Sequence, residues 1–110
     1  MDRVRRYDPT LACVSDSTLS AFLGYDLDDN LMSVPSIGPA NSVYLNMAGV
    51  FTTYQLIGKF LSFKDRINRQ EHLDKFYQWL LEIKCSARAH CIVYVISKKC
   101  ELLFPDMYIA

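Results

Sequence analysis

A chain of 110 residues has room for one domain with one hydrophobic core, and its apolar content of 51% is too high for a disordered segment. The twelve basic and twelve acidic residues cancel, yet residues 1–58 carry a net charge of −3 and residues 59–110 a net charge of +3. The chain start lacks a secretory signal and the longest apolar run, at 91–96, is too short to span a membrane, so we expect an intracellular, soluble protein.

The first predicted element after an arm is a short helix. Residues 1–14 are expected to form a loosely held arm, followed by a helical domain over 15–104 and a tail over 105–110. Ser15 begins a run of capping residues, and the apolar side chains that follow share one helical face. Gly24 is a typical helix stop, so a helix near 16–23 is predicted, and a polar, acidic loop follows over 25–32.

The segment around Gly38 has the most informative local chemistry. Glycine permits a left-handed backbone, and Pro39 stands where the first residue of a helix is expected. The predicted helix ends at Gly49 and directs inward an apolar set that consists of Ala40, Val43, Tyr44 and Met47.

Two further helices are predicted from apolar spacing. Thr52 or Thr53 is expected to cap a helix over 54–63, which is apolar around most of its circumference and is therefore predicted to be the most buried element. The aromatic residues Phe51, Tyr54, Phe60, Phe63, Phe76 and Tyr77 are predicted to lie in the core. From 69 to 84 the apolar residues recur with helical spacing, which predicts an amphipathic helix.

The last element is ambiguous in the sequence. Residues 91–96 are rich in β-branched side chains, and propensity alone favours a strand. A lone strand in an otherwise helical chain has no partner for its backbone groups, so a helix over 87–103, ended by Pro105, is predicted instead.

A resemblance to a known family rests on several runs of residues between Phe22 and Phe104. These runs are Ser36-Ile37-Gly38, Gly49, Tyr54, Ile57-Gly58-Lys59-Phe60-Leu61, Phe76-Tyr77-Gln78-Trp79-Leu80, Cys100 and Leu103-Phe104. In these runs the chain resembles the barrier-to-autointegration factor (BAF) family. The resemblance implies a compact, all-α, five-helix domain with a helix-hairpin-helix. It also implies a homodimer that binds and bridges double-stranded DNA without sequence preference and offers a groove to partner proteins of the nuclear envelope.

The chain departs from that family where phosphate would be held. Ser36 replaces the first hairpin glycine, and Pro39 removes an N–H donor. Val43 and Tyr44 stand where the family has lysines, and residues 7–58 contain no Lys or Arg. DNA binding gains much of its affinity from cations that neutralise phosphates, so we expect this site to be weakened.

Catalytic, metal and cofactor sites are not expected. His72 and His90 lack a positioned acid and nucleophile, and no phosphate loop or catalytic triad pattern is present. The four cysteines contain no Cys-x-x-Cys pair, so small buried thiols are predicted before a zinc site. A small-molecule substrate is not expected either.

Candidate binding residues therefore fall into three groups. The hairpin group, which would contact DNA or a partner, is Ser36, Ile37, Gly38, Pro39, Val43 and Tyr44. The candidate basic patch is Lys59, Lys64, Arg66, Arg69 and Lys75. The candidate interface residues are Tyr54 and Trp79, since aromatic residues are enriched at protein interfaces.

Two functions of different classes remain open at this point. In the first, the chain is a non-catalytic structural adaptor inside a larger assembly, either cytoskeletal or ciliary or associated with chromatin. In the second, it is a nuclear protein that binds and bridges double-stranded DNA. The missing cations of residues 7–58 favour the adaptor, whereas the BAF resemblance favours DNA.

Overall fold

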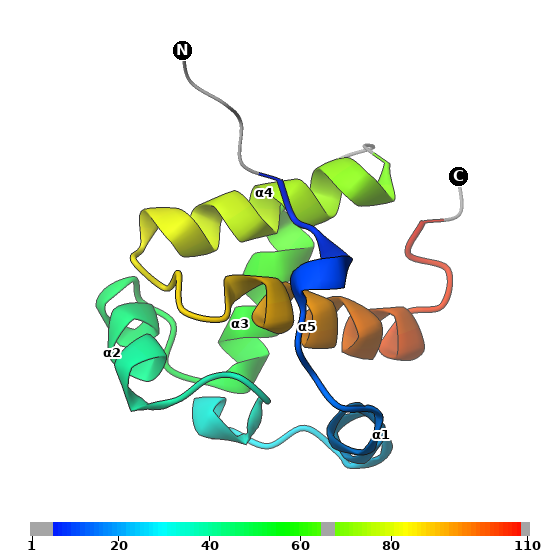
Figure 1. Cartoon of the computed structure of the whole chain (residues 1–110), viewed down its shortest axis with the longest axis horizontal. Coiled ribbons are helices and arrows are strands. Elements are labelled where there is room, and N and C mark those ends of the chain that lie inside the picture. Colours follow the sequence, from blue (N-terminus) through cyan, green and yellow to red (C-terminus); the bar gives the residue numbers. More distant parts are fainter. Residues whose placement is uncertain (1–5, 65–67, 109–110) are drawn as a thin grey trace.

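The computed structural model describes residues 6–64 and 68–108, which fold into α-helices joined by short connections (Figure 1). In this part of the chain there are five α-helices and no strand. The helices are α1 (Asp16–Gly24), α2 (Pro39–Met47), α3 (Thr53–Ser62), α4 (Arg69–Glu82) and α5 (Ala89–Leu103), with one-turn 3₁₀ helices η1 (Pro9–Leu11) and η2 (Leu31–Ser33). The all-α prediction is confirmed, and so is the helix at 91–96. Among the described residues, no helix is both long and apolar enough to cross a membrane.

Local chemistry accounts for the helix ends. The Ser15 side chain accepts the N–H of Thr18 and caps α1. Thr52 caps α3 in a reciprocal box with Gln55, whose side chain accepts the N–H of Thr52. Gly49 adopts φ +88, the left-handed conformation that terminates α2 and that glycine accepts without steric cost. The predicted stop of this helix at Gly49 is therefore confirmed.

Helix α5, not α3, is the most buried helix. It lies in the middle of the molecule and packs against η1, α1, α3 and α4 (Figure 1). Nine of its fifteen residues are buried, compared with four of ten in α3. The prediction that the 54–63 helix is the most buried element is wrong, because one side of α3, which includes Tyr54 and Gly58, faces water. The β-branched run 91–96 is instead the segment that the other helices surround.

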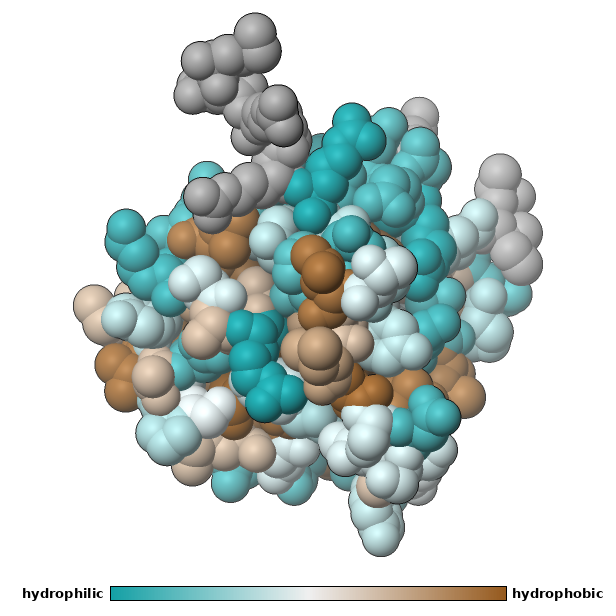
Figure 2. Space-filling view, in the orientation of Figure 1, coloured by the Kyte–Doolittle hydropathy of each residue, from teal (hydrophilic) through white to brown (hydrophobic). Residues whose placement is uncertain are grey.

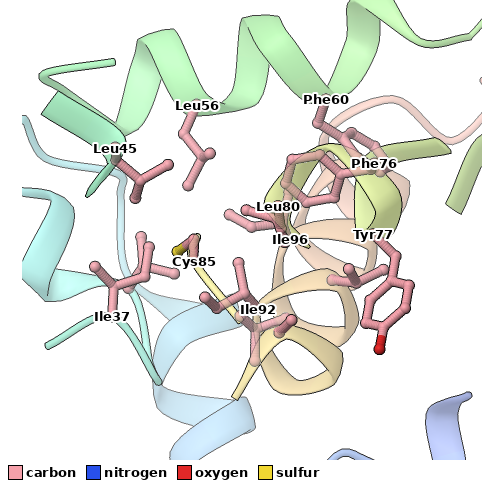
Figure 3. Close-up of a cluster of buried hydrophobic side chains, with 14 of the residues drawn as sticks. Ile37, Leu45, Leu56, Phe60, Phe76, Tyr77, Leu80, Cys85, Ile92 and Ile96 are labelled. Atoms are coloured by element: carbon pink, nitrogen blue, oxygen red, sulfur yellow. The ribbon is translucent and has the colours of Figure 1, made fainter. Parts of the chain in front are cut away.

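The core joins side chains from four of the five α-helices (Figure 3). Phe60 of α3 meets Phe76 of α4 edge to face, with ring centroids 5.1 Å apart. The core assignment of Phe60, Phe76 and Tyr77 is confirmed, and Phe63 is half-buried. It is wrong for Phe51 and Tyr54, which are both more than half exposed. Phe51 lies in the turn before α3, where no other element covers it.

The N-terminal arm is anchored from Tyr7 onward. The Tyr7 side chain is buried, and its N–H donates to Asp74 Oδ1 of α4 at 2.9 Å. The N–H of Asp8 donates to His90 Nδ1 at 3.1 Å. Burial raises the pKa of the Tyr7 phenol to about 12. The expectation of a loosely held arm is therefore wrong for residues 7–14, because α4 and α5 supply both a hydrophobic contact and hydrogen-bond partners.

Candidate functional site: the hairpin and the outer face of α2

The hairpin before α2 has its left-handed residue at Ser36, not at Gly38. Ser36 has φ 79, whereas Gly38 has φ −98 and ψ −171, an extended conformation that any residue adopts. Gly38 therefore does not use the left-handed conformation that glycine permits. Ile37 is buried, and its N–H donates to the Val34 carbonyl at 3.1 Å, which closes the turn. Pro39 is the first residue of α2, as predicted.

Ser36 combines backbone strain with an unpaired hydroxyl. A left-handed backbone costs roughly 1–2 kcal/mol for a residue with a Cβ. The Ser36 Oγ is also shielded from water without a hydrogen-bond partner. The Asn41 amide stabilises the surrounding turn, since its Nδ2 donates to the Ala87 carbonyl at 2.8 Å and to the Ser36 carbonyl at 3.4 Å. The turn is thus fixed from α2 and from the residues before α5.

The helical arm on the other side of this turn is short. Only η2, a single 3₁₀ turn, precedes the hairpin, with the Asn30 side chain accepting the N–H of Met32 at its start. The hairpin therefore joins a three-residue turn to the nine-residue helix α2. One such turn presents less surface than a full helix, and it packs on α2 with its Leu31 buried.

Helix α2 turns its apolar stripe outward. Its buried residues are Asn41 and Leu45, whereas Val43 is 54% exposed and Met47 is 78% exposed. Ala40 and Tyr44 are also exposed. The prediction that Ala40, Val43, Tyr44 and Met47 point inward is wrong, because Asn41 and Leu45 lie on the opposite side of the helix and make its contacts with the rest of the chain.

Phe51 is a further exposed apolar residue, four positions after Met47 in the chain. It is 60% exposed and follows Gly49 in the turn to α3. We call the exposed set Val43, Tyr44, Met47 and Phe51 the α2 face. Figure 2 shows hydrophobic residues gathered at the left edge of the molecule, where α2 lies in Figure 1. Sequence reasoning missed Met47 and Phe51 as surface residues. The sequence signal that was available is Leu45, the one large apolar side chain on the opposite side of α2, which marks the side that packs on the rest of the chain.

A small apolar hollow adjoins the α2 face. It has a volume of about 230 Å³ and lies between the ends of α2 and α4, lined by Tyr44, Met47, Ala48, Ile83 and Lys84. Lys84, two residues beyond the end of α4, has φ 72, so a left-handed residue other than glycine also lies at this hollow. Exposed aliphatic and aromatic side chains around a hollow are typical of a protein contact.

The predicted basic residues do not gather at the hairpin. The end of α3 and the start of α4, which carry most of them, lie at the upper right of Figure 1, away from α2. The Lys59 ammonium lies 5.2 Å from the ring centroids of both Phe63 and Trp79. Arg69 pairs with Glu101 at 3.0 Å. Lys64 follows the end of α3 and Lys75 lies in α4. Arg66 falls outside the described residues.

The two candidate interface residues have different environments. Tyr54 is exposed, and its hydroxyl donates to the Leu27 carbonyl at 2.7 Å. Trp79 is half-buried and stacks on Phe76 with ring centroids 6.0 Å apart. Trp79 therefore belongs to the aromatic cluster of α3 and α4, whereas Tyr54 presents its ring at the surface.

Both histidines are hydrogen-bonded within the fold. The fully buried His72 contacts the Phe60 carbonyl through Nε2 and the Tyr108 hydroxyl through Nδ1, both at 2.7 Å. A carbonyl only accepts, so Nε2 carries the proton and Nδ1 accepts from Tyr108. Burial lowers the pKa of His72, which favours this neutral ring. The contact also ties the described end of the C-terminal tail to α4.

The cysteines divide into buried and exposed thiols. Cys85, Cys91 and Cys100 are buried, as predicted, whereas Cys13 is exposed. Burial raises the pKa of Cys85 and of Cys100 to about 12, so both remain protonated at neutral pH. Within residues 6–64 and 68–108, no three His, Cys, Asp or Glu side chains come together as a metal site would require.

The hairpin group and the α2 face share Val43 and Tyr44, and both lie away from the candidate basic patch at the end of α3 and the start of α4. The cations that come close to the hairpin group lie outside that patch. Lys84 lines one hollow together with Tyr44, and Arg88 follows Ala87, whose carbonyl accepts from Asn41. The BAF resemblance rests on the sequence runs alone, because comparisons with protein-family models, with curated proteins and with solved structures found no match.

Proposed function

We propose that the protein is a non-catalytic structural adaptor that binds a protein partner through the α2 face. The observation that carries this proposal is the exposure of Val43, Met47 and Phe51, which leaves several large apolar side chains of α2 and of the turn after it in water. Such a surface costs solubility unless a partner covers it. Tyrosine, phenylalanine and methionine are also the side chains that protein interfaces favour.

Electrostatics support a protein partner over DNA at this place. The whole segment 7–58, which includes the hairpin and α2, lacks Lys and Arg. A protein that neutralises phosphates releases counterions, and each neutralised phosphate contributes a slope of about −0.9 in log affinity against log salt. Without cations from the hairpin and α2 themselves, most of that gain is lost. The remaining hairpin N–H groups alone would hold a phosphate weakly.

Binding and bridging of double-stranded DNA is the second candidate. The left-handed backbone at Ser36 favours it. Serine replaces the first glycine of the family's hairpin, yet the chain keeps the left-handed conformation that glycine would adopt there without steric cost. This candidate predicts tight duplex binding despite the missing cations. The adaptor predicts duplex affinity no better than the nonspecific range of roughly 10⁻⁴ to 10⁻⁶ M.

A pair of measurements tests the proposal. A fluorescence titration of the full chain with a plain duplex at two salt concentrations is expected to give weak binding. Nanomolar binding that Gly38→Glu abolishes while the fold remains intact would overturn the adaptor and support the DNA candidate. Gly38 is suited to this test, because its Cβ position is open and its backbone is extended.

The α2 face is tested in cells by quantitative co-precipitation. The double variant Met47→Glu/Phe51→Glu is expected to lose partners that the wild-type chain captures. Leu11→Glu/Leu102→Glu, which places the same charges on two other exposed apolar residues, is the matched control. Equal partner sets for both variants would contradict the assignment of binding to the α2 face. Circular dichroism confirms that each variant is folded.

A further inference from the structure

A second hollow lies between α1 and the segment 25–35, on another side of the molecule from the α2 face. Its volume is about 580 Å³, within the range of roughly 300–1,000 Å³ that ligand-binding sites have. Phe22, Leu27 and Val34 supply apolar lining, and Asp26 and Asp28 supply carboxylates. In Figure 1, α1 lies at the lower right and α2 at the left, so the two surfaces are well separated.

Hydrogen bonds from the rest of the fold fix the walls of this hollow. The buried Lys99 of α5 donates to the carbonyls of Phe22, Leu23 and Tyr25, at 3.0, 3.2 and 2.6 Å. These carbonyls end α1, where a positive charge is favourable. On the α3 side, the hydroxyl of Thr53 donates to the Asn30 carbonyl at 3.1 Å. The hollow is therefore held open by long-range contacts.

The carboxylates at this hollow have no cationic partner among the described residues. Asp28 is held in place, since its Oδ1 accepts the N–H of Asn30 at 2.8 Å and its Oδ2 accepts the Ser33 hydroxyl at 2.9 Å. Lys99 is only 3% exposed, and its ammonium is committed to the α1 carbonyls. The segment 7–58, which forms the hollow, contains no Lys or Arg that could pair with Asp26 and Asp28.

We propose that this hollow binds a basic, apolar peptide segment of a protein partner. In this arrangement an Arg or Lys of the segment pairs with Asp26 and Asp28, and an adjacent aliphatic side chain packs on the partly exposed Phe22 and Leu27. Charge complementarity selects the basic residue, and the apolar lining selects its neighbour. Tyr25, which also lines the hollow, is largely exposed and offers an aromatic surface to the guanidinium.

The test uses the full chain and a defined probe, acetyl-Gly-Leu-Arg-Leu-Gly-amide. Titration followed by amide NMR shifts is expected to saturate in the range of about 10⁻⁴ to 10⁻³ M, as for a short peptide with few anchors. The largest shifts are expected over 22–28 and 33–34. A peptide with citrulline in place of arginine keeps the shape but loses the charge, and it is expected to bind at least about fivefold more weakly.

Matched charge variants complete the test. Asp26→Asn/Asp28→Asn is expected to weaken binding of the arginine peptide about fivefold, whereas Asp29→Asn/Asp106→Asn, with the same change of net charge outside the hollow, leaves it unchanged. Equal weakening by both variants, or equal binding of the citrulline peptide, would overturn the proposal. Free arginine that binds as tightly as the peptide would assign the hollow to small organic cations instead. The substitutions and the peptide probe only the hollow, so a negative result here would leave the proposal for the α2 face unaffected.

Discussion

Helices α2 and α5 both carry several large apolar side chains, yet the fold buries one set and exposes the other. Helix α5 has η1, α1, α3 and α4 around it, so its side chains at 91–93, 95 and 96 are all buried. Helix α2 packs on the molecule through Leu45 and Asn41 and leaves Val43 and Met47 in water. Apolar content therefore does not decide burial. The number of elements packed around a helix does, and an apolar stripe left outside is the part available to a partner.

Two phenylalanines test this contrast with the largest expected effect. Phe60 is fully buried, whereas Phe51 is 60% exposed on the α2 face. Phe60→Ala is expected to lower the free energy of unfolding by about 3–5 kcal/mol, because it removes a core aromatic and leaves a cavity. Phe51→Ala is expected to change it by less than about 0.5 kcal/mol. Urea denaturation of both variants measures the difference, and similar losses would contradict the division into core and surface.

Acid is expected to lower the stability of the folded chain through His72, which lies in the core and not on the α2 face. Burial holds the pKa of His72 below its usual value of about 6.5. The unfolded chain then binds more protons than the folded chain, so stability is intact above about pH 6.5 and falls below it. This residue contributes at most about 1.4 kcal/mol per pH unit. Urea denaturation at pH 7.5, 6.5 and 5.5 measures the slope. An unchanged slope in the His72→Gln variant would show that another group is responsible.

The smallest expected effect concerns the left-handed turn at the hairpin. Ser36→Gly is expected to stabilise the protein by about 1 kcal/mol, because glycine accepts φ 79 without the steric cost that serine has and the unpaired hydroxyl is removed. Ser42→Gly, within α2, is expected to destabilise it by about 0.5–1 kcal/mol. Thermal denaturation of the two variants checks the opposite signs. Equal destabilisation would mean that the turn at Ser36 carries no strain.

Local signals in the sequence predicted the helices well. Capping residues and glycine stops placed α1, α2 and α3 within about two residues of their observed ends, because a helix end depends on groups only a few residues away. The candidate site was predicted in part. The turn before α2 was located from Gly38 and Pro39, but the sequence did not decide that Ser36, and not Gly38, adopts the left-handed backbone, because both residues are consistent with a turn when the rest of the chain is unknown.

The sequence by itself determined the helical class, the positions of the helix ends and the absence of cations from residues 7–58, since these depend on neighbouring residues and on composition. The tertiary structure alone decided which apolar face became core. It placed the β-branched segment 91–96 at the centre and the stripe of α2 outside, and it fixed the walls of the hollow beside α1 through Lys99 and Thr53, which are distant in the sequence. Periodicity shows that a helix has an apolar face, but the partner that covers this face is set by long-range packing.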